Sequence, residues 1–195
     1  MSIVLLGSTS GSCTLQEQAV AGTSVLTLPV GTGTVVANNV NSAIVSGTAV
    51  ASTSGTSIDF TGIPSWTKRI TVMFAGVSTS GTSNPQIQLG DSGGIETSGY
   101  NGFTWNNASG GAALSATGFN LFLANASAVI YGSFVLTNVS ANLWSVTSSF
   151  AATGTSTAMI TSGSKTLSDV LDRVRITTVN GTDTFDAGSI NILYE

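Results

Sequence analysis

The pattern that most limits the fold is a series of short segments in which apolar and polar side chains alternate with a period of two. In segment 173–177, Val174 and Ile176 alternate with two arginines. In segment 189–194, apolar and polar residues alternate in the same way as far as Ile192. This period is typical of strands with one buried face, and the many β-branched residues favour the same conformation. Helix-forming residues at 3.6-residue spacing are scarce. We therefore expect an all-β chain.

Turn signals rich in Gly and Asn separate these segments, and Asn180-Gly181 is a typical hairpin turn. A single helical turn is expected at 168–172. Many short strands with frequent turns indicate a sandwich or a barrel, and we expect a jelly-roll-like β-sandwich. The expected strands are 58–60, 69–77, 85–89, 119–123, 129–136, 143–150, 158–161, 173–177 and 189–194.

Aromatic residues divide the chain, since none precedes Phe60. A segment without aromatic bulk cannot readily build its own core. We therefore expect an extended arm at 1–55, followed by one β-sandwich at 56–195. Short apolar segments in the arm would become ordered by pairing with other chains. The residues expected to make this attachment are Leu15, Val25, Leu26, Leu28, Pro29, Val35 and Val36.

Charge excludes several classes of function. Charged residues make up 7% of the chain, against about 25% in a typical protein. Only five residues are Lys or Arg and the net charge is −4, so no nucleic-acid partner is expected. No apolar run approaches the length that spans a bilayer, and no secretory leader pattern is present, so no membrane insertion is expected. The single Cys13 is consistent with synthesis in a reducing cytosol.

Two sequence features resemble catalytic sites. Segment 90–94 reads GDSGG, as around the nucleophilic serine of some proteases, but the chain has no His to act as the base. Lys68 or Lys165 would be the alternative base for Ser92. Two pairs of carboxylates, Asp91 with Glu96 and Asp183 with Asp186, could in principle serve a glycosidase or a weak cation site. We favour turn formation for all of them, and expect no catalytic residue, metal or cofactor.

Segment 100–107 interleaves aromatic residues with Asn and carries no charge. Such side chains can stack on a sugar ring and hydrogen-bond its hydroxyl groups. The candidate ligand surface is therefore Tyr100, Trp105 and Asn106, with packing in the core as the alternative reading of the same residues.

The arm also resembles a segment of tailed-bacteriophage virion proteins. This resemblance rests on GSTSGSCTLQ at 7–16, AGTSVLTLP at 21–29 and TGT at 32–34. Parts of the β domain also look like a domain of phage tail or fibre proteins. These parts are the stretches 58–64, 68–72 and 87–91, and the stretch 171–176 with the residues that follow it as far as Ile192.

The resemblance implies a non-enzymatic homotrimer in the virion, made in the cytoplasm of the host bacterium, attached to other virion proteins through its arm and displaying the β domain. With no repeated shaft in the sequence, a short fibre or an adaptor is expected rather than a long fibre. The alternatives are a capsid decoration or cement protein, and a carbohydrate-binding module that attaches to a glycan of the host surface.

Overall fold

The computed structural model describes residues 2–6, 12–16, 44–108, 110, 112–123 and 125–195. The chain divides into two units, Met1–Ala37 and Asn38–Glu195. In the first unit, β1 (Ser2–Leu6) and β2 (Ser12–Gln16) form an antiparallel pair in which Leu15 lies opposite Ile3. The other residues expected to attach the arm lie outside the described residues. They are Val25, Leu26, Leu28, Pro29, Val35 and Val36.

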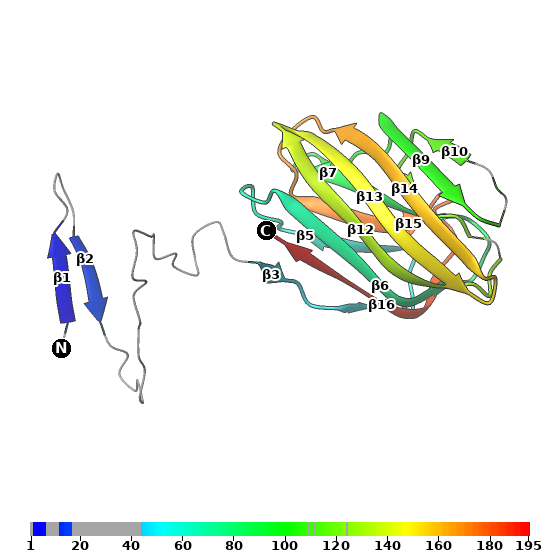
Figure 1. Ribbon diagram of the computed structural model, residues 1–195, viewed down its shortest axis with the longest axis horizontal. Helices are drawn as coiled ribbons and strands as arrows, with labels where there is room; N and C mark the ends of the chain where they lie inside the picture. The colour runs from blue at the N-terminus through cyan, green and yellow to red at the C-terminus, as the bar shows by residue number, and fades with distance from the viewer. Residues whose placement is uncertain (1, 7–11, 17–43, 109, 111, 124) are drawn as a thin grey trace. The chain divides into compact units, whose positions relative to one another are not determined.

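The second unit consists of two antiparallel sheets and contains no helix among its described residues, which confirms the predicted all-β sandwich (Figure 1). The large sheet has the order β10-β9-β14-β13-β12-β6-β16-β3, and β4 also pairs with β16. Its strands are β3 (Val45–Ser46), β4 (Val50–Ala51), β6 (Arg69–Thr79), β9 (Tyr100–Asn106), β10 (Ala112–Ser115), β12 (Val129–Ser140), β13 (Leu143–Thr153), β14 (Thr157–Thr166) and β16 (Phe185–Tyr194).

The small sheet lies behind the large one in Figure 1 and has the order β11-β7-β15-β5, with β8 also paired to β7. Its strands are β5 (Ser57–Thr61), β7 (Pro85–Asp91), β8 (Gly94–Ile95), β11 (Phe119–Asn120) and β15 (Arg173–Thr178). Of the expected strand at 119–123, only the first two residues pair. The strand order is mixed along the sequence, so each sheet pairs strands that are far apart in the chain.

Aromatic side chains from three strands of the large sheet form the centre of the core. The rings of Phe74 and Phe150 lie 5.2 Å apart between centroids, and those of Phe134 and Phe150 lie 4.9 Å apart. Val174 and Ile176 of β15 belong to the same buried cluster from the small sheet. The alternation that predicted these strands therefore places one face of each strand between the sheets.

Part of the predicted arm pairs with the sandwich. Residues 45–46 and 50–51 form β3 and β4 along the C-terminal strand, with Val45 opposite Tyr194 and Val50 opposite Ile190. The unit boundary at residue 37 thus precedes the expected boundary at 55. The reason is that an open sheet edge offers backbone N–H and C=O groups, which a segment without aromatic bulk can pair with equally well.

The prediction of a helical turn at 168–172 was wrong. Its backbone N–H groups find partners elsewhere in the chain instead of four residues back. Ser168 N donates to Glu96, Asp169 N donates to Asp91, and Asp172 N donates to the carbonyl of Gly90. These bonds hold the segment against the turn that follows β7.

Candidate functional site

The GDSGG segment lies where β7 ends, and its carboxylate is used to hold the turn. Asp91 is 3% exposed. One of its oxygens, Oδ1, accepts a hydrogen bond from Gly93 N at 2.8 Å, which closes a turn of the kind that Asp side chains commonly stabilise. The other, Oδ2, accepts bonds from Ser168 Oγ at 2.7 Å and Asp169 N at 2.9 Å. Asp91 therefore links its own turn to a segment far along the sequence.

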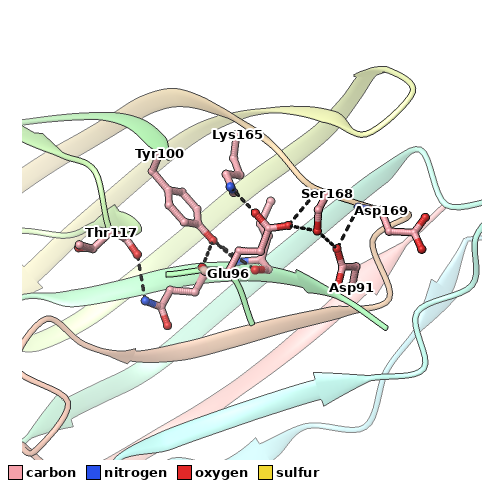
Figure 2. Close-up of polar contacts among 9 residues, drawn as sticks. Asp91, Glu96, Tyr100, Thr117, Lys165, Ser168 and Asp169 are labelled. Atoms are coloured by element: carbon pink, nitrogen blue, oxygen red, sulfur yellow. Dashed lines mark hydrogen bonds and ion pairs between the residues drawn. The ribbon is translucent and has the colours of Figure 1, made fainter. Parts of the chain in front are cut away.

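Glu96 continues this network on the same side of the turn (Figure 2). Its Oε1 accepts bonds from Ser168 N at 2.6 Å and Ser168 Oγ at 2.9 Å, and its Oε2 pairs with Lys165. The Lys165 ammonium group lies 5.2 Å from the centroid of the Tyr100 ring. The Tyr100 hydroxyl donates to the carbonyl of Glu96 at 2.9 Å and accepts from Leu89 N at 2.6 Å. The ammonium group is thus held between a carboxylate and an aromatic face.

These contacts decide the protonation of the two carboxyls. The bond from Ser168 is the main cause that lowers the pKa of Asp91. Burial acts to raise the pKa of Glu96, but the bonds from Lys165 and Ser168 outweigh it, so that this pKa is also lowered. Both groups are therefore ionised at neutral pH and unsuited to donate a proton as a general acid. Burial raises the pKa of Tyr100, which stays protonated.

The serine between the two carboxylates is Ser168, whereas Ser92 is exposed in the turn. Of the two lysines considered as a base, Lys165 is paired with Glu96, and Lys68 donates to Asn138 at 3.3 Å elsewhere in the fold. The chemistry of this cluster therefore favours fastening one loop to another, which is the turn-forming interpretation of these residues.

Only Asp183 of the second carboxylate pair holds a turn, because Asp186 lies within strand β16. Asp183 accepts hydrogen bonds from Ser83 N at 2.9 Å and Asn180 Nδ2 at 2.7 Å, and the bond from Asn180 lowers its pKa. Asp186 accepts from the Ser78 hydroxyl, on a different strand. Within the described ranges, no group of three or more His, Cys, Asp or Glu residues is arranged to hold a metal ion.

The candidate ligand surface lies on β9, where successive residues alternate between the two faces of the strand. Tyr100 and Asn106 are buried, whereas Trp105 is 39% exposed. The structure therefore does not bring the three residues onto one surface. Tyr100 serves the carboxylate network, and Trp105 stands on the outer face of the large sheet.

The outer face of the large sheet gathers exposed apolar side chains, which we call the neutral face. Its members are Phe103, Trp105, Leu114, Tyr131 and Ile160. Leu114 of the edge strand β10 lies opposite Phe103, and Trp105 lies between Ala112 and Ile160 in the strand pairing. The strands that carry these residues form the β9–β10 edge and the middle of the sheet (Figure 1). No residue from 97 to 164 is charged, so the face carries no charge there.

Close contacts on the inner side of β9 explain why Phe103 and Trp105 point outward, whereas Tyr100 at the start of the strand is buried. A Cβ atom on Gly102 would lie 3.0 Å from the carbonyl oxygen of Gly118. Next to it, Thr104 Oγ1 donates to the carbonyl of Asn120 at 2.8 Å and lies 3.2 Å from Thr161 Oγ1. The backbone of the 118–120 segment approaches too closely for a large side chain at these two positions, so β9 has a glycine and a threonine there.

Comparisons of this chain with family models, with curated proteins and with solved structures found no match. The part of the chain that the structure describes contains no helix long and apolar enough to cross a membrane. The site is therefore interpreted from its own residues.

Proposed function

We propose that this chain is a non-enzymatic structural protein of a tailed-phage particle. Its N-terminal unit attaches to another virion protein, and its β-sandwich is displayed as a homotrimer in a short fibre or an adaptor. The observation that carries the proposal is the neutral face, where exposed aromatic and aliphatic side chains share a sheet surface without charge.

The neutral face has the chemistry of a surface that packs against a neighbouring subunit. Phe103 is 45% exposed and Leu114 is 85% exposed, on neighbouring strands. Contiguous exposed apolar side chains mark interaction sites, and the centres of interfaces are poor in charge and rich in aromatic residues. Because the face carries no charge from residues 97–164, it brings no like charges against a neighbouring subunit. The number of three copies comes from the resemblance to phage proteins.

The N-terminal unit supports an attachment role. Its described residues form only the β1–β2 pair. A two-stranded hairpin is marginally stable in water by itself, and its open edges can pair with a strand of another protein. Docking to a partner therefore supplies what this hairpin lacks.

A non-enzymatic role agrees with how the carboxylates are used. Asp91, Glu96 and Asp183 each accept at least two hydrogen bonds from the protein, and each has a lowered pKa. Groups held in this way as ionised acceptors favour loop stabilisation over proton transfer.

Removal of residues 1–37 tests the attachment. We expect the truncated protein to keep the sandwich, because the second unit holds the whole core, but to be missing from particles assembled in its presence. The full-length chain is the control, and circular dichroism checks that the truncated protein is folded. Normal incorporation of the folded, truncated protein would contradict the proposed attachment.

A further inference from the structure

The outer face of the small sheet carries a polar groove with a volume of about 510 Å³. Its floor is formed by Gln86 and Gln88 of β7 and by Arg175 and Thr177 of β15, and its rim includes Thr97, Thr117 and the 179–181 turn. This volume falls in the range of small-molecule sites, about 300–1,000 Å³. The groove shares no residue with the neutral face or the carboxylate network.

The polar side chains of the floor lie in two rows across the strands. Arg175 stands between Gln88 and Asp59, and Thr177 stands between Gln86 and Ser57. Because neighbouring Ile87 and Leu89 are buried in the core, the two glutamines point to the opposite face of β7. Strand pairing therefore fixes the spacing of the amide, guanidinium and hydroxyl groups.

A loop holds the two glutamines in place. They are only 4% and 6% exposed, although they face outward. Gln88 Nε2 donates to the carbonyl of Thr117 at 2.9 Å, and the Thr117 hydroxyl donates to Gln86 Oε1 at 3.4 Å. The loop lies so close that a Cβ atom on Gly118 would be 2.5 Å from Gln86 Oε1. Groups ordered in advance in this way lose little conformational entropy when a ligand binds.

The groove is polar but close to neutral. Arg175 donates from Nε and Nη2 to the two carboxylate oxygens of Asp59, at 2.7 Å each. A guanidinium has five N–H donors, so further donors remain on Arg175 beyond these two bonds. The Asp59 charge offsets the positive charge, which disfavours an anionic ligand.

The apolar content of the groove is small. Of its lining residues only Val179, at the rim and 48% exposed, is aliphatic or aromatic. A peptide ligand needs apolar pockets for its side chains, which this groove does not provide. A ligand with hydroxyl groups around a compact ring fits the donors and acceptors of the floor.

We propose that this groove binds a neutral carbohydrate. The Arg175 guanidinium and the side chains of Gln88 and Thr177 would hydrogen-bond sugar hydroxyls, and Val179 would contact the ring's C–H groups. Since each such bond replaces one to water, affinity for a single sugar is expected on the order of millimolar. The inference does not depend on trimer formation or on the N-terminal unit.

Saturation-transfer NMR of the full-length protein tests this, with glucose, galactose, N-acetylglucosamine and rhamnose as probes. We expect a saturation-transfer signal from at least one sugar. Arg175→Lys, which keeps the charge but loses the planar donor fork, should weaken the affinity for that sugar about tenfold. Thr177→Val is a second variant that removes, at nearly constant volume, a hydroxyl whose oxygen can accept from a sugar while its proton is donated to the carbonyl of Thr56 at 2.8 Å. Trp105→Ala, on the neutral face, is the matched control and should bind normally.

Three results would overturn the proposal. The first is no signal from any of the four sugars. The second is a signal lost in Trp105→Ala but kept in both groove variants, which would place the sugar on the neutral face. The third is an Arg175-dependent signal from the neutral peptide N-acetyl-trialanine in the absence of sugar signals. Oligomeric mass, measured on the same samples, separates this test from that of the proposed structural role.

Discussion

The hydroxyl of Ser168 lies between two carboxylates that come from a distant part of the chain. Ser168 Oγ lies within hydrogen-bond distance of both Asp91 and Glu96, which share its single O–H proton, and the backbone N–H groups of Ser168 and Asp169 donate to the same two carboxylates. At the scale of single residues, this arrangement joins the turn after β7 to the segment before β15. Its strength depends on both carboxyls being ionised, which makes it sensitive to pH.

Asp91 offers the sharpest test of this dependence. Because its folded-state pKa is lowered, its contribution to stability is present above the unfolded-state value of about 4 and is lost as the pH falls through the folded-state value. We expect the urea concentration at the unfolding midpoint of the wild type to decrease as the pH is lowered below about 4. Asp91→Asn should have a lower midpoint at pH 7 and a weaker decline toward low pH.

Asp169→Asn is the matched control for this measurement, since it removes the same charge from a neighbouring side chain that accepts only a local bond from Val170 N. It should keep the midpoint and the pH profile of the wild type. Equal pH profiles for Asp91→Asn and the wild type would show that this carboxylate does not stabilise the fold through its charge.

At the scale of elements, the sequence predicts a strand wherever large apolar residues alternate toward the core. That condition holds for β6, β12, β13, β15 and β16, all of which were expected. It fails for β9, whose inward residues include Gly102 and Thr104 while Phe103 and Trp105 face outward. The middle of the segment thus carries the reverse of the usual pattern, because the close 118–120 backbone leaves no room for a large side chain at Gly102 or Thr104. The large inward residue of β9 is Tyr100, at the start of the strand.

Other elements and most of the site depend on the tertiary fold. β3 and β4 are two-residue pairs on the edge of β16, too short to carry a pattern. The turn at Asp91 was predictable from its residues. Its partners were not, since Ser168 is 77 residues away and is brought close only by the strand order of the small sheet. The groove likewise combines residues from β7, β15 and two loops.

Gly132 in β12 tests the packing between neighbouring strands. Its φ is +140°, and a Cβ atom would lie 2.2 Å from the carbonyl oxygen of Ser149 on β13. Gly132→Ala must move that backbone, so we expect a loss of more than about 2 kcal/mol of unfolding free energy in urea titration.

Gly62→Ala is the control, because Gly62 also has a positive φ of +73° but nothing within 4 Å of an added Cβ. It should cost only the backbone strain, about 1 kcal/mol. A loss for Gly132→Ala no greater than that for Gly62→Ala would contradict the close approach of β12 and β13.

At the scale of the whole molecule, the sandwich has surfaces of different chemistry. The large sheet presents the neutral face, with exposed apolar residues and no charge from 97 to 164. The small sheet presents a polar groove with a paired Arg175 and Asp59. The first suits contact between copies of the chain, and the second suits a small hydrophilic ligand. The uncharged stretch of the sequence therefore lies in the strands of the neutral face, where association between copies of the chain is proposed.

The most direct test of the central claim is the mass of the assembled protein, measured by sedimentation equilibrium for the wild type and for Leu114→Asp. We expect the wild type to have three times the mass of the chain. The variant should dissociate, because a charge buried at the interface is costly. Val179→Asp adds the same charge at an exposed site that directly follows β15 of the small sheet, and it should remain a trimer. A wild type with the mass of one chain, or a Leu114→Asp variant that stays as assembled as Val179→Asp, would contradict the account.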